Sequence, residues 1–163
     1  MAITQMKINP NKLKNEIVET VKYPDNYFDF ISLGAVLEHL YNPSDILEST
    51  LRWLKPGGII HIEVPSSDWL ISKLINLYYK LTCRDYVSNL SPMHMPYHLY
   101  EFSLNSLGMN SRNKYKIVFY EYYVCKTFLP PFMDFIIKPI MKKTNTGMQL
   151  CVWLKKILKT RFN

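Results

Sequence analysis

The sequence predicts an α/β fold, and three features carry that prediction. A strand, a helix and a second strand follow one another between residues 27 and 65. An amphipathic helix is predicted directly after them, at 66–80. Two further β-forming runs lie near the C-terminus, at 116–124 and 148–154. Alternation of strands with helices is typical of a mostly parallel sheet covered by helices.

The strand–helix–strand segment has a chemical cause at each boundary. Residues 28–33 (FDFISL) are an apolar run with one carboxylate, typical of a strand covered on both faces. Asn42 suits the N-cap of the next helix, and Pro43 suits its first position, where no N–H is needed. The turn at 55–58 (KPGG) ends that helix, and 59–64 (IIHIEV) is the second strand. This right-handed βαβ unit predicts a ligand site at the carboxyl ends of its strands.

The flanking segments give weaker signals. We expect residues 1–14 to be a disordered or adapted start, and 14–21 (KNEIVETV) to be a strand leading into a turn. Asp68 is the predicted N-cap of the helix at 66–80, and residues 82–100 form a long lid-like loop.

The C-terminal half mixes strong strand signals with helix breakers. The segment 103–113 predicts a short helix broken by Gly108. The segment 127–143 predicts a helix that is kinked or interrupted at Pro139.

Composition restricts the function classes. The chain of 163 residues is long enough for one domain and too short for two. The net charge of +7 comes from scattered lysines rather than an arginine-rich stripe, which argues against a nucleic-acid partner. Cys83, Cys125 and Cys151 have no metal-ligand or disulfide spacing. The N-terminus lacks the apolar run of a signal peptide, so a cytoplasmic location is expected.

Four pieces of the sequence, in order, resemble a known family. FDFI…LEHL.NP…L…LKPGG.IHIEVPS is similar to the second half of a class I S-adenosylmethionine-dependent methyltransferase of the small-molecule group. Residues 23–29 and 98–103 are similar to its flanking segments. The resemblance implies a Rossmann-like three-layer sandwich whose sheet closes with an antiparallel hairpin of 116–124 and 148–154, with 125–147 inserted between them. It also implies S-adenosylmethionine as cofactor and a small-molecule methyl acceptor.

The chain departs from this family at its N-terminal side. The family's Gly-rich turn and the acidic end of its second strand have no counterpart, because the five glycines form no G-x-G cluster. About 60 residues, or two βα units, are missing, so 1–163 is expected to be one N-terminally truncated domain. The family strand order 3-2-1-4-5-7-6 then leaves 28–33 at an open edge. Either the 14–21 strand pairs with this edge, or a partner chain or second copy covers it, or the protein is only marginally stable.

The resemblance also suggests site residues. Glu19 and Thr20 would lie near the adenine, or else at an exposed strand end. Leu33, Gly34 and Glu38 would border the rest of the cofactor. The catalytic candidates are the histidines at 39, 94 and 98, because a neutral imidazole with a pKa of about 6.5 can take a proton from an acceptor hydroxyl.

Alternatives to these assignments remain. Glu38 and His39 could simply start a loop and hydrogen-bond locally. No metal site is predicted, because Met95 and Pro96 separate His94 from His98 and no nearby Cys or Asp completes a set.

Three hypotheses for function follow. The first is a methyltransferase, or the C-terminal part of one. The second is a non-catalytic methyltransferase-like protein that binds a partner through its open sheet edge. The third is a membrane-surface protein that uses 128–143 and the basic tail; an ordinary insertion packed on the sheet is favoured over it, so membrane contact is not expected.

Overall fold

A computed structural model of the full chain describes residues 16–88, 90, 95, 97–112, 114–125, 127 and 129–157. The N-terminal segment 1–14 of the sequence prediction therefore lies outside the described residues. The elements in chain order are β1 (Phe28–Gly34), the 3-10 helix η2 (Leu37–His39), α2 (Pro43–Trp53), β2 (Leu54–Pro65), α3 (Leu70–Leu81), α4 (Leu104–Ser111), β3 (Tyr115–Tyr123), α5 (Pro131–Thr144) and β4 (Gln149–Lys156).

The four strands form one sheet in the order β1-β2-β4-β3. β1 and β2 are parallel, with Phe30 opposite Ile59 and Gly34 opposite Glu63. β4 runs antiparallel to both of its neighbours, β2 and β3. This order matches the expected 4-5-7-6 half of the family sheet, and the closing antiparallel pair is confirmed.

The predicted strand at 14–21 is wrong over its described part. Residues 16–21 form a turn, in which the amides of Thr20 and Val21 both donate to the Ile17 carbonyl at 3.0 Å. These local hydrogen bonds satisfy the backbone without a sheet neighbour, and Val18 still packs against the core from the turn. Among the described residues, β1 consequently pairs with β2 alone.

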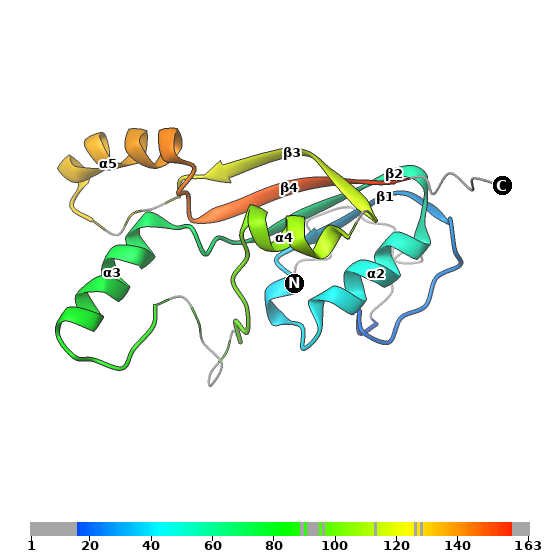
Figure 1. Ribbon diagram of the computed structural model, residues 1–163, viewed down its shortest axis with the longest axis horizontal. Helices are drawn as coiled ribbons and strands as arrows, with labels where there is room; N and C mark the ends of the chain where they lie inside the picture. The colour runs from blue at the N-terminus through cyan, green and yellow to red at the C-terminus, as the bar shows by residue number, and fades with distance from the viewer. Residues whose placement is uncertain are drawn as a thin grey trace, which may run out of the picture.

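The main core lies between one face of the sheet and the helices α2, η2 and α4. Ile60, Ile62 and Val64 of β2 alternate inward and are at most 1% exposed, as expected for a strand that packs on one face. Figure 1 shows α2 and α4 along the same side of the sheet. The other face carries Phe30 and Phe119, which are 49% and 54% exposed. Among the described residues, helices therefore cover only one of the two faces of the sheet.

The helices α3 and α5 form a second, smaller cluster. Trp69, Ile71 and Met141 are its buried residues, and Figure 1 shows both helices beyond one end of the strands. The insertion at 125–147 therefore packs mainly against α3 rather than on the sheet face. Phe132 and Phe135 of α5 are 75% and 86% exposed. No helix in the described part of the chain has the length and apolarity needed to cross a bilayer.

Three local expectations for these helices need correction. α4 runs through Gly108 without a break, because one glycine costs only about 1 kcal/mol and Ser103 and Ser106 form a capping box. α5 continues through Pro139, so the interrupted form is not observed. Asp68 does not cap α3, which begins at Leu70; its carboxylate instead accepts a hydrogen bond from Lys73 at 2.9 Å.

Candidate functional site

The carboxyl ends of β1 and β2 lie side by side. Gly34 is opposite Glu63, and the Ala35 amide donates to the Glu63 carbonyl at 2.9 Å. Ala35 then has a φ of 50°, a left-handed conformation uncommon outside glycine. This sharp turn directs the chain from the end of β1 into η2, and such conformations cluster at functional sites.

The short helix η2 fixes two of the predicted site residues. Leu37 is completely buried in the core and anchors the helix. Glu38 is 2% exposed, whereas His39 is exposed to solvent. The two side chains therefore lie next to each other at the end of β1, one buried and one accessible.

A distant segment packs against η2 and adds a second histidine. The Leu99 amide donates to the Glu38 carbonyl at 2.8 Å. His39 Nδ1 lies 2.7 Å from the carbonyl oxygen of Tyr97, 58 residues later. The rings of His39 and His98 consequently lie 5.0 Å apart. The structure thus brings together two of the three predicted catalytic histidines; the third, His94, lies outside the described residues.

The contact with Tyr97 sets the proton position on His39. A carbonyl oxygen only accepts hydrogen bonds, so Nδ1 carries the hydrogen and donates it. In the neutral ring, Nε2 then keeps its lone pair. Nε2 lies 3.8 Å from Glu38 Oε1.

The carboxylate of Glu38 is the unusual group of this site. Its Oε2 atom is buried and has no hydrogen-bond partner among the described residues. Buried polar atoms are almost always paired, and an unpaired buried charge is costly. None of the described residues therefore satisfies this oxygen.

The predicted cofactor residues at the N-terminal side take other positions. Glu19 and Thr20 lie in the turn rather than at a strand end, and the Thr20 hydroxyl donates to the Ile17 carbonyl. The Tyr41 amide donates to Glu19 Oε1 at 3.4 Å, which ties this turn to the residues after η2. Both line a pocket of about 730 Å³ beside α2. Leu33 is buried in the core, so only its backbone faces the end of β1.

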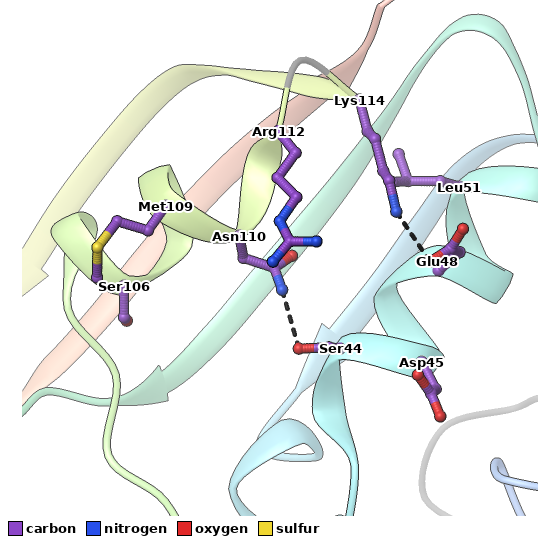
Figure 2. A pocket seen from close by; sticks show the side chains of 9 residues that line it. All are labelled: Ser44, Asp45, Glu48, Leu51, Ser106, Met109, Asn110, Arg112 and Lys114. Carbon is purple, nitrogen blue, oxygen red and sulfur yellow. Dashed lines mark hydrogen bonds and ion pairs between the residues drawn. The ribbon is translucent and has the colours of Figure 1, made fainter.

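Another pocket, of about 470 Å³, lies between α2 and α4. Figure 2 shows Lys114 directed toward Glu48, and Asn110 toward Ser44. Lys114 Nζ lies 2.8 Å from Glu48 Oε2, and Asn110 donates to the hydroxyl of Ser44. No sequence pattern predicts this pocket, because its residues meet only when α4 packs beside α2. These paired groups join the two helices rather than forming a reactive set.

A row of polar contacts crosses the sheet face that the described helices leave open. His61 Nδ1 lies 2.9 Å from the Ser32 hydroxyl, and His61 Nε2 lies 3.1 Å from Cys151 Sγ. Burial raises the pKa of the Cys151 thiol, which works against a nucleophilic thiolate. These contacts give His61 a structural role in the sheet.

Comparison with known proteins identifies the family. Residues 3–108, well over half of the chain, match a family described as "Methyltransferase domain". The ubiquinone/menaquinone biosynthesis C-methyltransferase UbiE of Stutzerimonas stutzeri is 35% identical over 63 residues, which is 37% of this chain and 24% of that protein. UbiE of Azotobacter vinelandii is 36% identical over the same length and the same shares. The match spans about a quarter of these curated relatives.

Solved structures agree with the fold. A methyltransferase of Methanosarcina mazei, described as SAM-dependent, has a TM-score of 0.57 at 18% identity, covering 88% of this chain and 66% of that one. A putative S-adenosylmethionine-dependent methyltransferase of Listeria monocytogenes has a TM-score of 0.60 at 11% identity, covering 95% and 74%. The [4+2]-cyclase SpnF has a TM-score of 0.53 at 17% identity, covering 88% and 54%. Family match, strand order and these structures agree, and the chain belongs to the class I S-adenosylmethionine-dependent methyltransferase family.

Proposed function

We propose that this chain is the C-terminal part of a methyltransferase domain that transfers a methyl group from S-adenosylmethionine to a small-molecule acceptor. The observation that carries the proposal is the cluster of Glu38, His39 and His98 at the carboxyl end of β1. In open α/β sheets this is the edge at which ligands bind. The reaction class comes from the family match. The fold alone does not define it, since SpnF has a similar fold and is described as a [4+2]-cyclase.

The backbone at the end of β1 is accessible, which supports a cofactor contact there. Gly34 is exposed, and a methyl group added there would meet only Glu63 Oε2, at 3.9 Å. A ligand can therefore approach the backbone of Gly34 closely. Gly34 and the Leu33 backbone would contact one side of S-adenosylmethionine. Glu19 is held near this edge through Tyr41 and would contact the adenine side.

The chain's own residues then position and deprotonate the acceptor. S-adenosylmethionine supplies an electrophilic methyl group that the acceptor attacks in line, so positioning contributes most of the rate. His39 Nε2 has a free lone pair in the neutral ring and takes the proton that an acceptor hydroxyl loses as its oxygen–methyl bond forms. The carbonyl of Tyr97 holds the ring in the orientation that this role needs.

The cofactor contact is tested by stabilisation in urea. A ligand present at a hundred times its dissociation constant raises the free energy of unfolding by about 2.7 kcal/mol. We expect S-adenosylhomocysteine to stabilise the wild-type chain and Gly108→Ala by this amount, and Gly34→Val by much less. Equal stabilisation of Gly34→Val and wild type would contradict the assigned site.

The open sheet favours a second candidate function, that of a non-catalytic partner subunit. Among the described residues β1 has one neighbour only, and the adjacent face exposes Phe30 and Phe119. Such an edge pairs readily with another strand.

Light scattering after size-exclusion chromatography separates the two candidates. A partner subunit gives a dimer that Phe30→Lys, a charge at the edge strand, converts to a monomer, and it binds no S-adenosylhomocysteine. A monomer that binds S-adenosylhomocysteine would reject this second candidate.

A further inference from the structure

We propose that Glu38, His39 and His98 bind a divalent first-row transition-metal ion, with zinc as the ion that best fits their chemistry. One ligand atom from each of the three residues lies within 4.8 Å of the others. Two imidazole nitrogens with one carboxylate oxygen form a set found in catalytic zinc sites, which keep the fourth position open. The sequence predicted no metal here, because it compared His94 with His98 and not His39 with His98.

The buried carboxylate is the independent observation that points to a cation. Glu38 is 2% exposed, and its Oε2 atom has no hydrogen-bond partner among the described residues. If Glu38 merely began a loop, as the alternative interpretation holds, its carboxylate would be expected to face solvent. Here the carboxylate is held inside, beside two imidazole rings, where a bound cation would satisfy it.

The surroundings of His39 match those of a metal ligand. Ligating histidines usually donate their second ring N–H to a carbonyl or carboxylate, which fixes the ring and directs the other nitrogen at the metal. His39 donates from Nδ1 to the Tyr97 carbonyl at 2.7 Å. This leaves Nε2 for the ion, and Nε2 is the atom that lies 3.8 Å from Glu38 Oε1.

The separation between His39 and Glu38 requires only a small contraction, and the three ligand atoms together would close from within 4.8 Å of one another. Nitrogen and oxygen ligands about 2.1 Å from a tetrahedral zinc ion lie about 3.4 Å from each other. The separation of 3.8 Å between His39 Nε2 and Glu38 Oε1 therefore closes by a few tenths of an ångström. The His39 side chain is 36% exposed, so water or a ligand oxygen can take the fourth position.

The ion would change how the acceptor is activated, and this step alone rests on the proposed function. With a metal on Nε2, His39 no longer serves as the proton acceptor. The ion would instead bind the acceptor oxygen directly and lower the pKa of its hydroxyl, and the released proton would pass to the solvent that reaches this exposed site. The acceptor class would then be molecules that present a hydroxyl or carboxylate oxygen to the metal.

The test is a zinc titration of the tag-free full chain after treatment with a chelator, in competition with a chromophoric chelator. We expect one saturable zinc site, and at least about tenfold weaker binding in Glu38→Gln and His98→Ala, since loss of a ligand costs no less than loss of its outer hydrogen bond. His61→Ala and Cys151→Ser are the matched controls, because that pair lies 3.1 Å apart on the sheet and is the alternative location for a zinc site. Both should bind zinc as wild type does, and excess Mg²⁺ should not compete.

Cobalt substitution and proton NMR of the histidine rings provide readouts that do not depend on the variants folding. Co²⁺ should give ligand-field bands without a thiolate charge-transfer band, and zinc should shift the ring signals of His39 and His98 but not His61. Absence of saturable binding, equal affinity in Glu38→Gln and wild type, or a thiolate spectrum would each overturn the proposal. These results do not depend on S-adenosylhomocysteine, so a failed metal site and a failed cofactor site are distinguishable.

Discussion

The contrast between two glycines provides a sharp test of how β3, α5 and β4 pack. A methyl group added at Gly147 would lie 2.6 Å from the Tyr123 carbonyl oxygen and 2.9 Å from its carbon. These are backbone atoms, and the same oxygen already accepts a hydrogen bond from the Met148 amide at 2.9 Å. The clash can be relieved only by opening the β3–β4 pair, so Gly147→Ala should lower the free energy of unfolding by about 1–3 kcal/mol.

Gly108→Ala is the matched control with the opposite sign. Nothing lies within 4 Å of a methyl group at Gly108, which sits inside α4. Alanine should therefore stabilise the protein by about 0.5–1 kcal/mol. The two variants should differ by about 1.5–4 kcal/mol.

Urea unfolding followed by far-ultraviolet circular dichroism measures this difference. The slope with urea should stay constant, because neither change alters the surface exposed on unfolding. A Gly147→Ala protein as stable as wild type would refute the close approach of β3 to the start of β4. A destabilised Gly108→Ala protein would refute a continuous α4.

Three further predictions concern the residues that support the site and the core. Leu37→Ala should cost about 2–5 kcal/mol in urea unfolding, because this fully buried side chain anchors η2; a smaller loss would mean that η2 is not held by the core. Ser103→Ala should cost about 0.5–2 kcal/mol through loss of the capping box, and an unchanged urea midpoint would exclude that cap. Burial raises the pKa of Tyr115 from 10.0 to about 12, so its contribution to stability is complete below pH 10 and is lost as the pH rises through 12. Urea midpoints measured across this range should fall less steeply in Tyr115→Phe, and an equal slope would contradict the burial of that phenol.

The βαβ unit could be predicted from the sequence because its signals are local. Pro43 stands at the start of α2, and Gly57 has a positive φ of 77° where the start of β2 shifts its register against β1, in place of the predicted turn. The alternation of Ile60, Ile62 and Val64 shows directly which face of β2 is buried. None of these inferences needs knowledge of a distant segment.

The secondary-structure predictions from the sequence are wrong where contacts with other parts of the chain determine the local conformation. The segment 16–21 has the composition of a strand, yet a turn satisfies its amides and still brings Val18 to the core. Gly108 breaks the helical pattern only weakly, because the cap formed by Ser103 and Ser106 offsets it. Asp68 would suit an N-cap, but Lys73 binds its carboxylate instead.

The candidate site was predicted in part. Glu38 and His39 follow the first strand closely. They could be singled out because open α/β sheets bind ligands at the carboxyl ends of their strands. That His98 approaches His39 depends on the Tyr97 and Leu99 contacts with η2, which no local pattern encodes. The burial of Glu38 was also not visible from the sequence, and it is the observation that suggests a metal ion.

Calorimetric titration of the purified chain with S-adenosylhomocysteine tests the central proposal most directly, with circular dichroism recorded on the same sample. We expect a dissociation constant in the micromolar range, equivalent to about −8 kcal/mol, and weaker binding by Gly34→Val. A folded chain that takes up no S-adenosylhomocysteine would contradict the cofactor site at the end of β1 and leave the partner subunit as the better account.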